Sequence, residues 1–128
     1  MNKTLSTICI VCPNGCRLTV RKSAGGYLVE GNKCKRGETY GVEEASAPKR
    51  IVTCVVPTES IDHPCVPVKT ATPVLKKDIP KLLNKLYALK IKLPVRRGDT
   101  ALDDTRESGA VVVVTRSTPF ALSERKRA

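Results

Sequence analysis

Cysteines recur in one short part of the chain, Cys-Ile-Val-Cys-Pro-Asn-Gly-Cys at residues 9–16 and Asn-Lys-Cys-Lys-Arg-Gly at residues 32–37. Together they give the spacing C-x2-C-x3-C-x17-C. A [4Fe-4S] cluster takes one thiolate ligand at each of its four irons. Three close cysteines followed by a distant one suit that requirement. The spacing therefore predicts cluster ligands at Cys9, Cys12, Cys16 and Cys34.

The residues between the third and fourth cysteines are expected to form a β-hairpin. Residues 17–21 and 27–30 alternate between polar and apolar side chains, with Gly25 and Gly26 between them. A tight turn at residues 24–25 or 25–26 brings the chain opposite the third cysteine to within about one residue of the fourth. The hairpin would thus deliver the fourth thiol without any long-range contact.

Other residues near the cysteines are candidate cofactor-binding residues. Gly15 leaves room for backbone amides to approach the cluster sulfurs. A cluster with four thiolates carries net negative charge, which Lys33, Lys35 and Arg36 would balance. Nearby cations favour the reduced state and raise the potential.

Zinc is the alternative occupant of the four cysteines, although structural zinc sites usually take their ligands as two separated pairs. Disulfides or plain thiols are a further alternative. Disulfides are typical of oxidising compartments, whereas residues 1–10 contain no apolar run long enough for a secretion signal. No segment reaches transmembrane length either. We therefore expect a soluble, cytoplasmic protein whose thiols bind a metal centre.

The formal net charge of +11 permits a nucleic-acid or other acidic partner. The basic residues are spread through both halves, and the four aromatic residues, Tyr27, Tyr40, Tyr87 and Phe120, lie far apart. A binder of single-stranded nucleic acid is expected to interleave aromatic and basic residues. Nucleic acid is therefore the less favoured partner. A zinc-stapled basic module that binds nucleic acid or an acidic protein is the alternative function.

The whole chain predicts an α+β protein. We expect a Cys-rich β-hairpin lobe at residues 1–57, a small lobe with a mixed sheet and one amphipathic helix at 58–118, and a mobile basic tail at 119–128. The helix is indicated by apolar residues at helical spacing from Ile79 to Leu89. Further predicted elements are a short helical or turn-like piece at 38–44, strands at 49–56, 65–70, 90–95 and 110–114, and a loop at 101–109.

Signals for catalysis by the chain itself are missing from the sequence. It has no phosphate-binding glycine-rich loop and no nucleophile beside a plausible base. The adjacent acids Asp103 and Asp104 are expected to be solvated. Cys54 and Cys65 are expected to be small core residues, and His63 to lie at the surface. Lys77, Lys81 and Lys85 are expected to form the solvated face of the helix.

Residues 9–37 resemble the amino-terminal iron–sulfur segment of molybdopterin-dependent oxidoreductases such as formate dehydrogenases. Those proteins share the cysteine triplet, the hairpin, and a distant cysteine followed by a basic residue and glycine, here Cys34, Arg36 and Gly37. Residues 9–116 resemble more closely a family of small bacterial proteins, the domain of unknown function 1667 family. The shared motifs are Cys-Pro-Asn-Gly-Cys-Arg-Leu at 12–18, Gly-Asn-Lys-Cys-Lys-Arg-Gly at 31–37, Pro-Val-Lys-Thr at 67–70, Leu-Pro-Val-Arg-Arg-Gly-Asp at 93–99 and Val-Val-Val-Thr-Arg at 112–116.

This second resemblance implies a companion of flavin- or nicotinamide-dependent dehydrogenases of the glycerol-3-phosphate dehydrogenase type. The protein would then be a non-catalytic component of an oxidoreductase complex that passes electrons onward. Molybdopterin is not implied, because the chain lacks the hundreds of residues that cradle that cofactor.

Overall fold

A computed structural model of the chain describes residues 3–119. Apart from Pro119, the predicted basic tail lies outside these residues. The chain divides into two units, Met1–Lys49 and Arg50–Ala128, which are described separately below as unit 1 and unit 2. Both combine helix with antiparallel sheet, so the predicted α+β class is confirmed.

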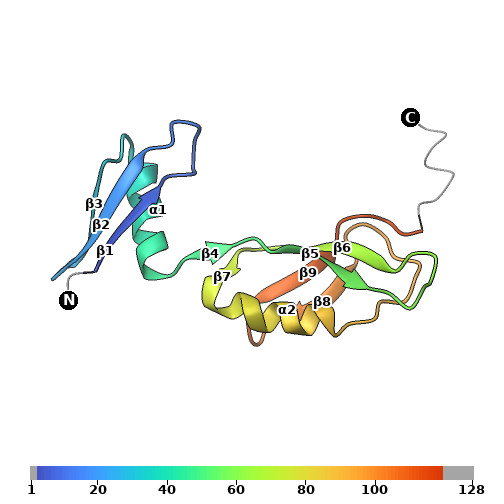
Figure 1. Ribbon diagram of the computed structural model, residues 1–128. Helices are drawn as coiled ribbons and strands as arrows, with labels where there is room; N and C mark the ends of the chain where they lie inside the picture. Colours follow the sequence, from blue (N-terminus) through green and yellow to red (C-terminus); the bar gives the residue numbers. More distant parts are fainter. Residues whose placement is uncertain (1–2, 120–128) are drawn as a thin grey trace. The chain divides into compact units, whose positions relative to one another are not determined.

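Unit 1 is a three-stranded antiparallel sheet with one helix (Figure 1). Its strands are β1 (Thr4–Ile8), β2 (Arg17–Ser23) and β3 (Gly26–Glu30), in the order β1-β2-β3, and its helix is α1 (Lys35–Ser46). Ser23 pairs with Gly26, so the hairpin turns at Ala24 and Gly25, one of the two positions predicted. The first residues of the chain supply a third strand beside the predicted hairpin.

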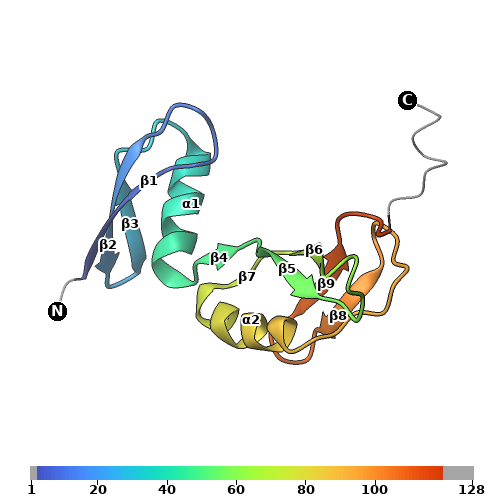
Figure 2. The same cartoon turned by 45° about the vertical axis from the view of Figure 1, so that its right-hand side comes forward.

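Helix α1 lies against the sheet of unit 1 (Figure 2), and glycine residues make the contact. The buried residues of α1 are Gly37 and Gly41, four positions apart and therefore on one face of the helix. A Cβ at Gly41 would lie 3.0 Å from both Cγ atoms of Val29 and 3.2 Å from a Cγ of Val20, closer than side chains normally approach. The helix backbone thus lies directly on the sheet.

The sequence predicted only a short helical or turn-like piece in this region. The helix is twelve residues long and begins immediately after Cys34. It was underestimated because its packing face consists of glycines, which have low helix propensity and give no apolar periodicity.

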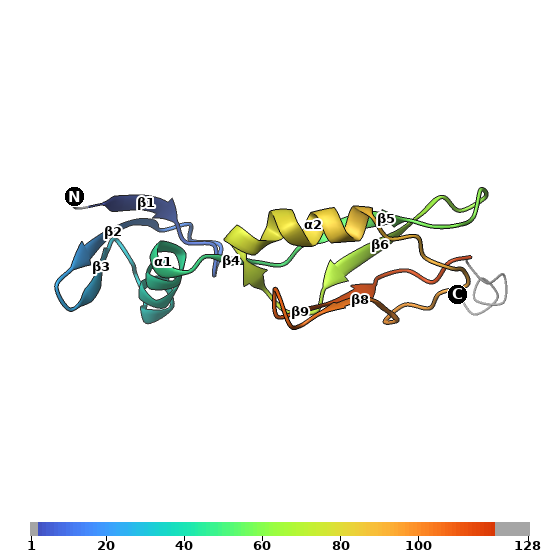
Figure 3. The ribbon, with the colours of Figure 1, turned by 90° about the horizontal axis from the view of Figure 1, so that it is seen from below.

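Unit 2 is a four-stranded antiparallel sheet with α2 (Ile79–Tyr87) lying along it (Figure 3). The strand order is β5 (Thr53–Pro57), β6 (Cys65–Thr70), β9 (Ala110–Val114) and β8 (Thr100–Asp104). Strand β7 (Val74–Leu75) and the 3-10 turn η1 (Lys76–Asp78) lead into α2, while β4 (Lys49–Arg50) lies at the division between the units. The apolar core is formed by Val52, Val56, Val66, Val68, Val74, Leu82, Leu86, Ala110, Val112 and Val114.

Several predictions for unit 2 differ from the structure. Strand β5 pairs with β6 over five residues and so belongs to unit 2, which moves the division between the lobes from residue 57 to Lys49. The ladders are antiparallel rather than mixed. Residues 90–95 form no strand, only isolated bridges at Ile91 and Val95. The predicted loop at 101–109 begins with strand β8.

A buried carboxylate connects α2 to the turn after β8. Asp104 is only 7% exposed, and its two carboxylate oxygens accept hydrogen bonds from Lys85 Nζ at 2.5 Å and Ser108 Oγ at 2.5 Å. Lys85 also lies 2.6 Å from a carboxylate oxygen of Glu107. The expectation that Asp104 is solvated and that Lys85 belongs to a solvated helix face is therefore wrong.

These contacts change the pKa of the Asp104 carboxyl. Burial alone raises its pKa, but the hydrogen bonds from Lys85 and Ser108 and the positive charge of Lys85 outweigh burial, so the pKa lies below its ordinary value. The unfolded value is about 3.9. A carboxyl with a lowered folded pKa stabilises the fold fully above the unfolded pKa, and this contribution is lost as the pH falls through the folded pKa.

The substitution Asp104→Asn is expected to lower the free energy of unfolding by about 1–3 kcal/mol at pH 7, because Lys85 loses its buried charged acceptor. The difference from the unmodified protein should shrink as the pH falls below about 4. Urea unfolding of the two proteins at pH 7 and at a pH below about 4 measures this difference in the free energy of unfolding. Asp62→Asn, in an exposed loop, is the matched control and should change little. Equal destabilisation by both substitutions would contradict the role given to Asp104.

Candidate cysteine site

The first and third cysteines lie opposite each other where β1 ends and β2 begins. The ladder between these strands closes with Ile8 opposite Arg17, and the next backbone contact is a 2.8 Å hydrogen bond from the Cys9 N–H to the Cys16 carbonyl. Cys9 is 4% exposed, while Cys16 is half-buried. The two cysteines therefore close the base of the loop that contains Cys12.

The fourth cysteine is the residue that precedes α1. The turn that brings it there begins at Gly31, whose φ is +90° and where a Cβ would lie 2.1 Å from the Arg17 carbonyl oxygen. Asn32 follows, and its side-chain amide donates a 3.1 Å hydrogen bond to the Cys34 carbonyl. Cys34 is the N-cap of α1, and its carbonyl also accepts from the Gly37 N–H at 3.1 Å.

Gly37 lies close to a cysteine from each of the two segments, Cys9 and Cys34. A Cβ at Gly37 would lie 3.8 Å from Cys9 Sγ and 3.0 Å from the Cβ of Asn32. The N–H of the same glycine donates to the Cys34 carbonyl and makes the largest contribution to the lowered pKa of the Cys34 thiol. Both the β1–β2 loop and the start of α1 lie at one end of unit 1 (Figures 1 and 2). The structure thus brings Cys9, Cys16 and Cys34 to one end of the sheet, as the hairpin predicted.

The start of α1 lowers the pKa of the Cys34 thiol. The largest contribution comes from the backbone N–H of Gly37, followed by that of Arg36, whose guanidinium also acts on the sulfur. Neither N–H makes a regular capping hydrogen bond to the thiol, yet their partial positive charges at a helix N-terminus favour a thiolate. An exposed thiol with a lowered pKa is a ready metal ligand.

Cys12 and Gly15 lie in the loop between β1 and β2. Cys12 is half-buried, and Gly15 has a φ of +59°, the left-handed conformation that favours glycine. A Cβ at Gly15 would meet no atom closer than 4.0 Å, so the backbone conformation and not crowding accounts for this glycine. Among residues 3–119, no three Cys, His, Asp or Glu side chains are arranged to hold a single metal ion.

The predicted basic residues surround the fourth cysteine. Lys33, Lys35 and Arg36 are exposed, and Arg36 acts directly on the Cys34 sulfur. Arg17 is exposed beside the third cysteine and lies opposite Ile8 across the β1–β2 ladder. Positive charge is therefore concentrated at the end of unit 1 that carries the thiols.

The two remaining cysteines and the histidine lie in unit 2. Cys54 packs against the core, and burial raises the pKa of its thiol, as expected of a small core residue. Cys65 is exposed, so the same expectation is wrong for it. The β5–β6 register pairs Cys54 with Val68 and Cys65 with Pro57, which places the two cysteines on opposite faces of the sheet and excludes a disulfide between them in this fold. His63 is exposed, as predicted.

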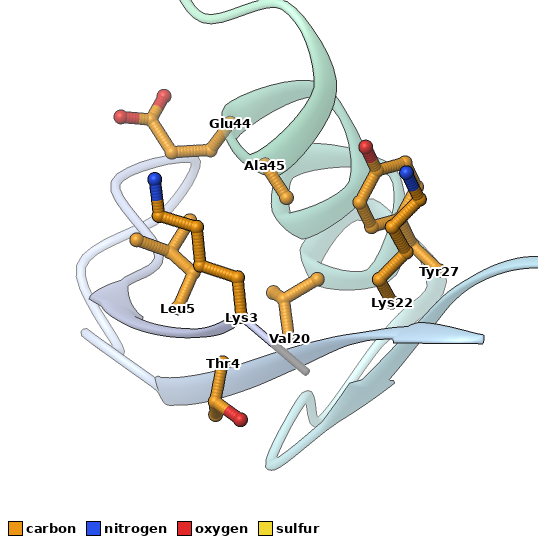
Figure 4. Close-up of a pocket in the computed structure, with 8 residues that line it drawn as sticks. All are labelled: Lys3, Thr4, Leu5, Val20, Lys22, Tyr27, Glu44 and Ala45. Atoms are coloured by element: carbon orange, nitrogen blue, oxygen red, sulfur yellow. The ribbon is translucent and has the colours of Figure 1, made fainter. Parts of the chain in front are cut away.

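A pocket of about 490 Å³ lies at the other end of unit 1 (Figure 4). It is formed where β1 begins and α1 ends, whereas the cysteines lie where β1 ends and α1 begins. The pocket is lined by Lys3, Thr4, Leu5, Val20, Lys22, Tyr27, Glu44 and Ala45. It is therefore separate from the thiols.

Two residues of the cysteine site were missed by the sequence analysis, although both belong to a motif quoted there. Gly31 makes the turn over Arg17, and Asn32 ties the Cys34 carbonyl and packs beside Gly37. A glycine three residues and an asparagine two residues before a cysteine that caps a helix are the signal that could have identified them, because both residue types are common in turns.

The fold and site define a small α+β protein whose first unit carries three cysteines in and beside the β1–β2 loop and a fourth at a helix N-terminus. The chain belongs to the family described as "Protein of unknown function (DUF1667)", whose model matches residues 35–116. This match begins one residue after the fourth cysteine and covers α1 and most of unit 2. It therefore shows the family but does not extend to Cys9, Cys12, Cys16 or Cys34.

The chain is also similar to a protein of known structure. The NMR structure of a protein from Clostridium perfringens is 26% identical, with a TM-score of 0.48, and the match covers 54% of this chain and 82% of that one. No curated protein matches the chain. Within the described residues, no helix is both long enough and apolar enough to cross a membrane.

Proposed function

We propose that the protein is an electron-transfer component that carries one [4Fe-4S] cluster on Cys9, Cys12, Cys16 and Cys34. The observation that carries the proposal is the position of Gly37, which lies beside the Cys9 sulfur and whose N–H donates to the Cys34 carbonyl at the start of α1. Cys16 lies opposite Cys9, and Cys12 lies in the loop that these two residues close. Such a cluster takes up and releases single electrons when bound.

The donor chemistry of the site fits this group. Metal binding requires deprotonated thiols, and the helix N-terminus favours deprotonation of Cys34. Gly37 offers no side chain that would fill the space beside the Cys9 sulfur. In a four-iron cluster each thiolate binds a different iron, so its ligands need not converge on one point as the ligands of a single ion do.

Residues around the thiols have supporting roles in this proposal. Lys33, Lys35 and Arg36 would balance the negative charge of four thiolates, and the turn at Gly15 would direct backbone amides toward the sulfurs. Asn32 would hold the Cys34 carbonyl so that the thiol stays at the start of α1. Burial of Cys9 would exclude water from one side of the site.

The enzyme that we propose as partner is a cytoplasmic flavin- or nicotinamide-dependent dehydrogenase of the glycerol-3-phosphate dehydrogenase type. This part of the proposal rests on the resemblance of residues 9–116 described above. The similarity of the cysteine segment to that of molybdopterin oxidoreductases supports the cluster, not the choice of partner. The chain itself would carry electrons without catalysing the dehydrogenation.

The proposal is tested by purifying the protein without oxygen and measuring iron, inorganic sulfide and zinc. About four irons and four sulfides per chain are expected, with broad visible absorbance that fades on reduction. Zinc without iron or sulfide would contradict the proposal and favour the alternative, a zinc-stapled basic binding module. A chain that takes up neither metal from an anaerobic reconstitution would also contradict it.

A further inference from the structure

Apolar side chains are exposed around the cysteines of unit 1. Ile8 is 53% exposed, Ile10 72% and Val11 44%, although Cys9 between them is buried. Single exposed apolar residues are common on protein surfaces. Here three of them lie within four consecutive positions, and the fold of unit 1 leaves all three uncovered. Their exposure gives no benefit to folding, because the buried apolar side chains of the sheet are Leu18 and Val20.

Cations lie at the same end of unit 1 as this apolar group. Arg17 lies opposite Ile8 in the β1–β2 ladder, so the two side chains are neighbours on the same face of the sheet. Lys33, Lys35 and Arg36 are exposed around Cys34, whose carbonyl accepts from the N–H of Gly37, the residue beside the Cys9 sulfur. Residues 8–17 and 33–37 together contain these four cations and no Asp or Glu, and Glu38 is the first carboxylate to follow.

We propose that Ile8, Ile10 and Val11, bordered by Arg17, Lys33, Lys35 and Arg36, form the docking surface for a protein partner whose contact face is apolar at its centre and acidic at its border. We call these seven residues the thiol-end surface. An apolar centre with a charged border is the usual anatomy of a protein interface, and complementary charge speeds the encounter of two proteins.

This inference rests on the proposed function in one respect, the redox nature of the partner. A partner that docks over Ile10 and Val11 contacts the loop that carries Cys12, and so comes close to the thiols. The shape and charge of the surface do not depend on what the thiols hold. An anionic membrane would meet the same cations, but three aliphatic side chains without an aromatic residue offer little to a lipid surface.

Flavodoxin, a small acidic flavoprotein, is the probe for this surface. The isotope-labelled protein, as purified without oxygen, is titrated with flavodoxin, and amide chemical shifts and the dissociation constant are measured. We expect shifts at residues 8–17 and 33–37 and a dissociation constant that rises with salt. Ile10→Ser and Arg17→Glu should each raise the dissociation constant by about tenfold or more.

Two substitutions are matched controls. Leu28→Ser removes an apolar residue that is also exposed, at 53% like Ile8, but lies on β3. Lys77→Glu reverses an exposed charge in unit 2. Both should leave the dissociation constant within about twofold of the unmodified protein.

Three results would overturn the inference: no binding of flavodoxin, equal losses in the controls and in the Ile10 and Arg17 variants, or shifts confined to unit 2. Binding instead to vesicles of phosphatidylglycerol and phosphatidylcholine, with the same loss in Ile10→Ser, would replace the protein partner with a membrane surface. Iron content is measured on each sample. A preparation that lacks iron but binds flavodoxin as expected would contradict the proposed function and leave the docking surface standing.

Discussion

Cys34→Ser is expected to remove almost all bound iron from the protein. Replacing only an outer-shell partner of a metal ligand typically costs about 10–100-fold in metal affinity, and this substitution removes one of the four proposed ligands. The serine hydroxyl is not ionised near neutral pH, whereas the helix N-terminus lowers the pKa of the Cys34 thiol and favours its anion. Iron and sulfide per chain, together with visible absorbance, measure the loss.

The control for this substitution is Cys65→Ser. Cys65 is exposed, as Cys34 is, but it lies at the start of β6 in unit 2. Its replacement should leave the iron content unchanged. If Cys65→Ser lost iron and Cys34→Ser kept it, the assignment of the fourth ligand would be wrong.

Gly31→Ala is expected to unfold unit 1 or to displace Cys34 from the start of α1. A Cβ at this position would lie 2.1 Å from the Arg17 carbonyl oxygen, a distance that backbone atoms can relieve only by moving. The φ of +90° adds strain of about 1–3 kcal/mol for a residue other than glycine. Both effects act on the turn between β3 and α1.

Amide hydrogen exchange resolves this effect within the chain. Val20 and Val29 report on the unit 1 sheet, and their amides should exchange much faster in Gly31→Ala, while those of Val66 and Val112 in unit 2 should change little. Gly25→Ala is the control, because no atom lies within 4 Å of a Cβ there and its φ is not in the left-handed region. Protection of Val20 that survives Gly31→Ala would show that the turn tolerates a side chain.

The hairpin and the approach of the fourth cysteine could be predicted because both follow from local rules. A two-residue turn fixes the register of two strands, and the register fixes which residues lie opposite each other. The pairing of Ser23 with Gly26 extends along the hairpin and brings Gly31, three residues before Cys34, against the Arg17 carbonyl at the start of β2. The turn and the register were therefore enough to predict that the fourth cysteine returns toward the other three.

Other features depend on contacts that the sequence pattern hides. Strand β8 ends in Asp103 and Asp104, which disfavour strands, and it forms because it pairs with β9 and because Asp104 gains hydrogen bonds from Lys85 and Ser108. Residues 90–95 alternate as a strand would, but Pro94 has no N–H to donate to a ladder. Cysteine is a residue type that is often buried, but the β5–β6 register places Cys65 on the exposed face of the sheet.

The glycine face of α1 has a consequence for how unit 1 stays folded. A helix that meets its sheet through Gly37 and Gly41 buries no side chain completely, and its Val42 and Ala45 are only half-buried, so the hydrophobic free energy that holds the two together is limited. Cys34 and Cys9 belong to the helix start and to the sheet, respectively. Any ligand that bridges their sulfurs would act as a crosslink between the two layers, and its binding free energy would become part of the folding free energy of the unit.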